Sequence, residues 1–260
     1  MTYVTLICKM KNIINNYKVE GQDKVKKIED LLVIESYYNE LEMNRFLNKD
    51  IKKHIKLFEF KRNEYICREG EDMDYFIFLI EGKAKVFKTL PNGRTLLLSF
   101  YKPLQVIGDI EIVKNQAASG TIQALSDCYC LVISMEKARE ELTKDSRFLK
   151  FTCESLAEKL SVISMNSSIN LLYPLENRLA SYINESLVSM KGKNPKEYVE
   201  FDENLINIAE LLGSSYRHLL RTLNGLCKKG VLDKDNVGYR VINKEILTKL
   251  AGDLYKDVSI

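Results

Sequence analysis

The sequence predicts an α+β protein in which a β jelly roll is followed by one long helix and a small domain that ends in a hairpin. Three observations support this prediction. Apolar residues alternate along short runs between residues 58 and 133, which is the period of half-buried strands. They recur at spacings of three and four in residues 146–173, as on one face of a helix. A basic helix pair over residues 208–232 precedes a hairpin pattern.

Length and composition set the limits of the organisation. At 260 residues with 45% hydrophobic residues, the chain is long enough to bury two cores. We expect a helical segment over residues 1–57, the jelly roll over 58–135, the long helix over 136–173 and the C-terminal domain over 174–260.

Several classes of protein are disfavoured. No run approaches the ~20 apolar residues of a membrane-spanning helix, and the N-terminus lacks the regions of a secretion signal. The six cysteines fit neither a disulfide-rich secreted domain nor a zinc pattern. We therefore expect a cytoplasmic protein without membrane association, metal or cofactor.

The N-terminal segment has helical spacings. Two helices are predicted from the apolar positions Ile28, Leu31 and Leu32, and then Leu41, Phe46, Leu47 and Ile51. Residues 1–35 carry no pattern to which a function can be attached.

The jelly roll is predicted from strands and turns that succeed one another at short intervals. Phe76, Phe78 and Ile80 alternate with their neighbours, and Asn92-Gly93 between two strand-like runs is a strong hairpin signal. Many short strands with regular turns are typical of a β-sandwich or jelly roll.

The long helix carries an apolar stripe at near-heptad spacing: Leu149, Cys153, Leu156, Leu160 and Ile163. This spacing favours a seam between two helices, whereas the alternative is a single helix that packs on its own β domain. Pro174 ends the helix and begins the C-terminal domain.

The helix pair over residues 208–232 is broken at Gly213, which can adopt the left-handed conformation that ends a helix. Ser214 and Ser215 supply hydroxyls that can cap the second helix. In that helix, Tyr216, Leu219, Leu223 and Leu226 are expected to face inward. Another face carries Arg217, Arg221, Asn224 and Lys228.

No Asp or Glu occurs from Leu211 to Leu232, so the second helix forms a local positive patch. Such a patch favours a phosphate backbone, and arginines pair with guanine edges in a major groove. The alternative is an ordinary amphipathic helix pair with a solvated basic face. Strand-like residues 231–232 and 239–242 follow, and a basic helix with a hairpin directly after it is a winged helix-turn-helix arrangement.

Residues 208–232, IAELLGSSYRHLLRTLNGLCKKGVL, resemble the DNA-binding domain of the Crp/Fnr (catabolite activator-like) transcription regulators, and with IGDIE upstream they look most like the YeiL-type subgroup. The resemblance implies a cyclic-nucleotide-binding-like jelly-roll sensor domain (a double-stranded β-helix), a dimerisation helix and a homodimer on double-stranded DNA. It implies that Tyr216, Arg217 and Arg221 contact bases, although the first two depart from the family's usual Arg-Glu pair. We also expect DNA contacts at Ser214, Ser215, His218, Lys228 and Arg240. RNA polymerase is a further candidate partner.

In cyclic-nucleotide-binding relatives a short loop and an Arg hold the phosphate. The resemblance places the pocket of this chain at Gly108, Asp109, Glu111, Ser119, Gly120 and Thr121. Ala118 stands where the phosphate-binding Arg would be, and an unpaired carboxylate there would repel a phosphate. We therefore expect no cyclic AMP binding of the usual kind, and an effector of another class or none. Loop capping is the alternative role for Asp109 and Glu111, and the Ser/Asn cluster at residues 161–168 is a further candidate ligand contact.

Two other functions remain as alternatives. A metal-dependent enzyme of the cupin type would need clustered His ligands, and the two histidines, His54 and His218, lie far apart in the sequence. We therefore expect no catalytic residues. A ligand-sensing or interaction module that lacks DNA binding is disfavoured by the intact basic face of the second helix.

Overall fold

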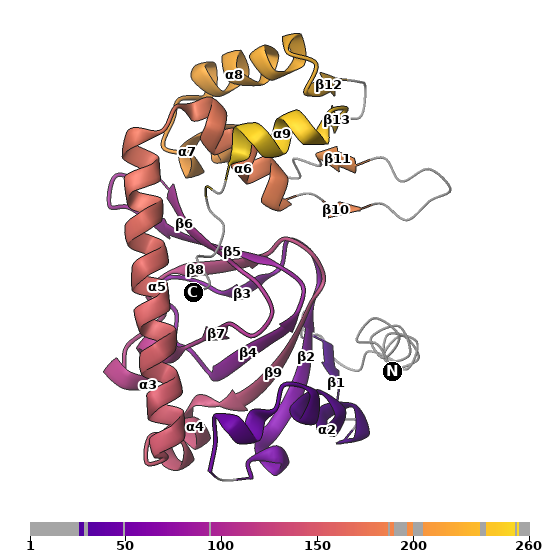
Figure 1. Cartoon of the computed structure of the whole chain (residues 1–260). Helices are drawn as coiled ribbons and strands as arrows, with labels where there is room; N and C mark the ends of the chain where they lie inside the picture. Colours follow the sequence, from indigo (N-terminus) through magenta and orange to yellow (C-terminus); the bar gives the residue numbers. More distant parts are fainter. Residues whose placement is uncertain are drawn as a thin grey trace.

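The computed structural model of the chain (Figure 1) describes residues 26–28, 31–48, 50–93, 95–186, 188–189, 197–199, 205–234, 238–252 and 254. Two antiparallel sheets form the jelly roll in the middle of the molecule. Helix α5 (Ser146–Leu172) runs along one side of it, and the C-terminal domain lies at the far end of α5. The predicted α+β architecture is confirmed.

The first sheet has the order β1-β2-β9-β4-β7 and the second the order β3-β8-β5-β6. The Asn92-Gly93 turn joins β5 to β6 as predicted, and Gly93 has the positive φ of 78° that such a turn requires. The strands are β1 (Lys26–Ile28), β2 (Ile55–Phe60), β3 (Tyr65–Cys67), β4 (Tyr75–Glu81), β5 (Ala84–Thr89), β6 (Thr95–Tyr101), β7 (Val106–Ile107), β8 (Thr121–Ala124) and β9 (Cys128–Ser134).

Strand alternation creates three apolar clusters. Phe76, Phe78 and Ile80 lie on the outer face of the first sheet, covered by α2 (Leu31–Glu40), α4 (Met135–Glu141) and the start of α5. The next residues along β4 face the interior between the two sheets. The outer face of the second sheet, with Leu97 and Phe100, packs on the C-terminal domain. Both faces of both sheets are therefore buried over much of their area.

The N-terminal segment differs from the predicted helix pair. Residues 26–28 form β1, which pairs with β2, and α2 is the first described helix. Leu31 and Leu32, expected on the packing face, are 71% and 78% exposed. The longer apolar and aromatic set Val33, Ile34, Tyr37 and Tyr38 faces the core instead.

The predicted second helix is absent from the described residues. Two short 3-10 turns, Met43–Arg45 and Lys52–His54, take its place. Leu47 and Ile51 are buried all the same, because the irregular segment still lies against the first sheet.

The region predicted as one long helix over residues 136–173 contains two helices. α4 ends at Glu141, and α5 begins at Ser146. Asp145 separates them, because its carboxylate accepts hydrogen bonds from the backbone N–H groups of Arg147 and Phe148 and so caps α5. The same carboxylate accepts from the backbone and side chain of Asn48, at 2.6 and 2.8 Å.

The predicted stripe on α5 faces away from the jelly roll except at Ile163, which lines a cavity of the jelly roll, and at the partly buried Leu156. Leu149, Cys153, Leu160 and Ile163 are exposed, and Leu160 is 70% exposed. α5 instead packs on its own jelly roll through Phe148, Thr152, Val162, Asn166 and Ile169. α5 therefore packs on its own β domain, as the alternative expected, but mainly through residues other than those of the stripe.

The C-terminal domain is built on a sheet of order β10-β11-β13-β12. The predicted first helix, helix pair, hairpin and final helix are all present. The elements are α6 (Leu175–Ser186), β10 (Val188–Ser189), β11 (Glu197–Val199), α7 (Leu205–Leu211), α8 (Tyr216–Lys228), β12 (Leu232–Lys234), β13 (Tyr239–Val241) and α9 (Lys244–Ala251). The predicted loop at residues 191–195 lies outside the described residues.

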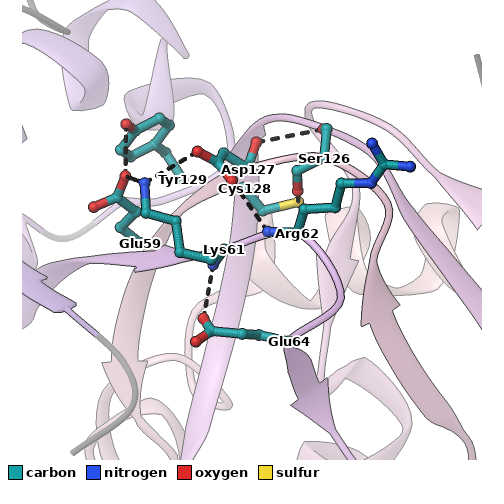
Figure 2. A network of polar contacts seen from close by, with 8 residues as sticks. All are labelled: Glu59, Lys61, Arg62, Glu64, Ser126, Asp127, Cys128 and Tyr129. Atoms are coloured by element: carbon teal, nitrogen blue, oxygen red, sulfur yellow. Dashed lines mark hydrogen bonds and ion pairs between the residues drawn. The ribbon is translucent and has the colours of Figure 1, made fainter. Parts of the chain in front are cut away.

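A polar network closes the turn between β2 and β3 (Figure 2). Lys61 Nζ lies 2.6 Å from Glu59 Oε1 and 3.0 Å from Asp127 Oδ2. Tyr129 donates its hydroxyl to the same buried Glu59 carboxylate at 2.9 Å. Burial opposes the charge on Lys61, but its hydrogen bonds to Glu59 and Asp127 outweigh that effect and raise its pKa. The network ties the β2–β3 turn to the start of β9.

Candidate nucleic-acid interface and candidate ligand pocket

The helix pair has the local geometry that its sequence predicts. Gly213 has φ 61° and ends α7, because a left-handed residue cannot continue the helix. Ser215 is the N-cap of α8, and its hydroxyl accepts from the backbone N–H of His218. Ser214 Oγ lies 3.3 Å from His218 Nδ1. Hydrogen bonds among Ser214, Ser215 and His218 thus stabilise the N-terminus of α8.

Helix α8 is divided into an apolar face and a basic face. Leu219, Leu223 and Leu226 are fully buried against the rest of the C-terminal domain. Arg217, Arg221, Asn224 and Lys228 are exposed, as predicted. Within the described part of the chain, no hydrogen bond or ion pair engages the side chains of Arg217, Arg221 or Lys228. These cations are therefore available to a polyanion.

Tyr216 does not face inward as expected, since its side chain is 45% exposed. It lies in the first turn of α8, where the helix leaves the core. Tyr216 lines a hollow together with Ser215 and Leu96. The spacing of three residues between Tyr216 and Leu219 predicts that both side chains face inward. The prediction fails for Tyr216 because a residue at a helix end has fewer neighbours to bury it than a residue in the middle.

The hairpin β12–β13 forms the wing. Arg240 Nη2 lies 2.6 Å from Asp233 Oδ2, its cross-strand neighbour. The arginine is half-buried, so one side of its guanidinium is committed to holding the wing together. Sequence reasoning missed this pair, although cross-strand register places the two residues side by side.

Arg178 of α6 connects the helix pair to the end of α5. Its guanidinium donates to the carbonyl of Leu212 and, at 3.2 Å, to that of Tyr173. The residue is buried, and Gly213 lies next to it. One side chain therefore satisfies the carbonyls that two helix ends leave open.

The C-terminal domain also rests on the jelly roll through polar contacts. The largely buried Glu185 carboxylate lies 3.5 Å from both Lys83 Nζ and Lys102 Nζ. Lys83 Nζ also donates to the Glu185 carbonyl at 3.2 Å. Charged contacts, beside the apolar ones, thus hold α6 against the jelly roll.

A cavity of about 90 Å³ lies at the position of the predicted ligand pocket, and it is small beside the about 300–1,000 Å³ of ordinary small-molecule sites. Five of the six predicted residues line it: Gly108, Asp109, Glu111, Ser119 and Gly120. Thr121 does not. Its hydroxyl accepts from the backbone N–H of Glu69, because β8 turns that side chain toward the β3–β4 loop.

The expectation of an unpaired carboxylate in this pocket is wrong. Lys159 of α5 places its Nζ 2.7 and 2.8 Å from the two oxygens of Asp109. The same ammonium donates to the Val106 carbonyl at 2.7 Å and lies 4.9 Å from the Tyr101 ring centroid. Ser155 donates to Asp109 at 3.0 Å. The chain itself therefore supplies the cation that the pocket contains.

Lys159 remains charged despite its burial. Burial opposes its charge, but Tyr101 and Asp109 outweigh that effect, so the pKa of Lys159 is raised. Helical spacing offers only a weak signal for this residue, which lies four positions from Ser155 and so shares its helix face.

Glu111 has the loop-capping role that was the alternative for it. Its Oε1 accepts from the backbone N–H of Ser119 at 2.8 Å and from the Ser119 hydroxyl at 2.7 Å. The Ser and Asn side chains of the cluster at residues 161–168 do not line the cavity. Ser161, Ser167 and Ser168 donate to carbonyls of their own helix, and Asn166 donates to Leu98.

In the described part of the chain, no three His, Cys, Asp or Glu residues are grouped so that they could hold a metal ion. No helix there is both long and apolar enough to cross a membrane.

Comparisons with known proteins agree with this architecture. The cyclic nucleotide-binding domain model matches residues 57–145. The regulatory protein YeiL of Escherichia coli O157:H7 is 34% identical over 204 residues, which cover 78% of this chain and 88% of that protein.

Two crystal structures support the fold. A CRP-family transcriptional regulator from Thermus thermophilus has a TM-score of 0.60 at 19% identity and covers 76% of this chain and 98% of its own. A Crp/Fnr-family protein from Eubacterium rectale has a TM-score of 0.62 at 16% identity, with coverage of 77% and 91%. The architecture agrees with these structures in its jelly roll, its long helix and its helix pair followed by a wing. Together with the extended similarity to YeiL, it shows that this chain belongs to the Crp/Fnr family of DNA-binding transcription regulators.

Proposed function

We propose that the chain acts as a homodimer whose two α8 helices read successive major grooves of an imperfect palindrome, about one helical turn apart. The observation that carries this proposal is the exposed basic face of α8, whose cations have no partner among the described residues. Tyr216, Arg217 and Arg221 contact bases in this proposal. Ser214, Ser215, His218, Lys228 and Arg240 contact the phosphate backbone.

The exposed stripe of α5 supports the dimer. Leu149, Cys153, Leu156, Leu160 and Ile163 repeat at the spacing of a two-helix seam, and an uncovered apolar stripe of this length is unusual in a monomer. Leu171, Leu172 and Tyr173 add exposed apolar surface at the C-terminal end of α5, at 84%, 79% and 47% exposure. RNA polymerase is the further protein partner in this proposal, and the cytoplasm is its location.

The properties of the pocket at Asp109 support the proposal that the protein is controlled by an effector other than a cyclic nucleotide, or by no effector. Its volume of about 90 Å³ is small, and Lys159 already neutralises Asp109. Ala118 supplies no charge for a phosphate. A cyclic nucleotide would have to displace a buried ion pair and still lack its guanidinium partner.

The proposed function is tested by selecting bound sequences from a random pool of double-stranded DNA with the full chain. We expect an enriched two-fold motif and an affinity that falls steeply with salt. Failure to enrich any sequence, together with binding that does not depend on salt, would support the alternative of an interaction module without DNA binding.

Calorimetry with cyclic AMP tests the effector part separately. We expect no binding below about millimolar concentration, because the pocket lacks the phosphate partner. Tight binding would overturn the argument from Ala118 while leaving the DNA-binding proposal intact.

A further inference from the structure

A second cavity lies in the jelly roll beside the pocket at Asp109, and no part of the proposed function uses it. Its volume is about 240 Å³, which is larger than that of the pocket at Asp109. It lies between the β2 and β3 strands and the β3–β4 loop, and we call it the aromatic groove. Its lining includes Phe58, Phe60, Tyr65, Tyr75, Cys67 and Met73, with Arg68, Glu71, Asp72 and Asp74 at its mouth.

The base of the groove is built from aromatic rings. Phe58 and Tyr75 meet edge to face, with centroids 5.0 Å apart, and Phe60 lies beside Phe58 at 6.4 Å. Aromatic ring faces attract cations, and here the half-buried Tyr75 and the exposed Tyr65 present the ring surface that a ligand can reach, because Phe58 and Phe60 are each 4% exposed. The chain already uses this property, since Lys27 Nζ lies 5.9 Å from the Phe58 centroid.

The mouth of the groove is acidic. Glu71, Asp72 and Asp74 are exposed, and within the described residues no side-chain hydrogen bond or ion pair neutralises them. Arg68 is the one cation among the described residues of the lining, and its guanidinium stacks on Tyr65 at 3.5 Å from the centroid. The charges of the lining therefore leave an excess of two negative charges (three carboxylates against one guanidinium), which favours a cation over an anion.

The groove is also held in shape. Its strands β2 and β3 are joined by the turn that the Glu59–Lys61–Asp127 network closes (Figure 2). Phe60 and Tyr65 lie on either side of this turn. A site whose aromatic walls are fixed before binding loses less conformational entropy when a ligand enters.

We propose that the aromatic groove binds a small organic ammonium ion, with its apolar part against the rings and its charge beside the carboxylates at residues 71–74. The volume is below that of drug-sized sites, so the ligand is small. Burial raises the pKa of Cys67 to about 12, so its thiol stays neutral and serves as an apolar wall.

The groove is coupled to the pocket at Asp109 through a soft partition. Cys67 and Met73 line both cavities. A Cβ on Gly108 would lie 3.4 Å from the Met73 Cε and 3.2 Å from the Met135 Cε, so both methyl groups pack where Asp109 begins α3 (Asp109–Lys114). Methionine readily changes rotamer, so a ligand in the groove moves Met73 and thereby the segment that Lys159 holds to α5.

The test uses the full chain with methyl-labelled methionine, observed by NMR during titration with three probes of matched size: benzylammonium, benzyl alcohol and benzoate. We expect benzylammonium to shift the Met73 and Met135 methyl signals saturably, with a Kd on the order of millimolar. Benzyl alcohol should bind at least about fivefold more weakly, and benzoate should not saturate. The exposed Met165 on α5 serves as an internal control and should not shift.

Variants locate the site. Asp72→Asn combined with Asp74→Asn should weaken benzylammonium binding about fivefold and leave benzyl alcohol unchanged, because only the charge interaction is removed. Tyr75→Leu should weaken benzylammonium further. Glu245→Gln, which removes a single charge on α9 far from the groove in sequence, should change neither. The proposal is overturned if benzoate binds as well as benzylammonium, if the acidic variants leave the preference intact, or if no saturation occurs up to about 50 mM.

Discussion

Arg221 lies near the middle of the exposed face of α8, where a side chain that enters a major groove reaches base edges. Replacing it with Ala should cost about 1–3 kcal/mol on the selected DNA sequence and relax the preference at one base position. Affinity measured on operator variants checks this prediction. Unchanged discrimination among the variants would remove Arg221 from the reading set.

Lys228, at the other end of the same face, provides the matched comparison. If its ammonium contacts phosphate, Lys228→Ala should weaken all sequences similarly and reduce the salt slope by about one unit. A change confined to one base position would contradict this assignment.

Lys159 supplies the positive charge that neutralises Asp109 in the pocket of the jelly roll. Lys159→Met should lower the free energy of unfolding by about 3–5 kcal/mol, because it leaves the buried Asp109 carboxylate without its cation. Adding Asp109→Asn should restore part of the loss, since a neutral amide needs no counter-ion. Urea unfolding of the single and double variants decides the matter, and equal stability of the two would refute the coupling.

At the scale of an element, α5 has two faces with different roles. One packs on its own jelly roll, and the other is apolar and uncovered. Helical spacing predicted the apolar stripe, of which Leu149, Cys153 and Leu160 are exposed, while the packing face is set by the shape of the β domain.

Leu160 tests the proposed seam because it is 70% exposed in the protomer. Leu160→Asp should weaken dimerisation by at least about tenfold, since it buries a charge in an apolar seam, yet leave the protomer folded. Sedimentation velocity over a range of concentrations measures the shift. Ile246→Asp, on an exposed apolar site of α9, is the control and should leave the dimer unchanged.

At the scale of the whole molecule, the jelly roll and the C-terminal domain share one apolar cluster, and a lysine is buried beside it. Lys85 is 1% exposed, and its cross-strand partner Phe100 belongs to that cluster. Burial lowers the pKa of Lys85 from its ordinary 10.5 to about 7. The position therefore makes the junction between the domains sensitive to pH.

The sign of this effect follows from proton binding. Between pH 7 and 10.5 the unfolded chain keeps a proton on Lys85 that the folded protein releases, so stability rises with pH across this window. Lys85→Met should accordingly stabilise most at about pH 6 and much less at about pH 9. Urea unfolding at both values measures this, and an equal gain at both would contradict it.

Much of the fold was predictable from the sequence because it rests on local patterns. The hairpin at Asn92-Gly93, the break at Gly213 and the buried Leu219, Leu223 and Leu226 follow from turn chemistry and helical period. The packing face of α2 was not predictable, since two adjacent apolar pairs, Leu31–Leu32 and Val33–Ile34, competed for the core. Only the position of the first sheet selected between them.

By itself, the sequence determined the order of the domains, the basic face of α8 and the apolar stripe of α5, since each depends on residues close together in the chain. The tertiary structure alone decided which charges are available. It paired Asp109 with Lys159, which lies 50 residues away in the sequence, and it engaged the Arg240 guanidinium in an ion pair within the wing. It also assembled the aromatic groove from three separate segments. Such contacts arise only when sheets and helices pack, because neither period nor spacing specifies which distant residues meet.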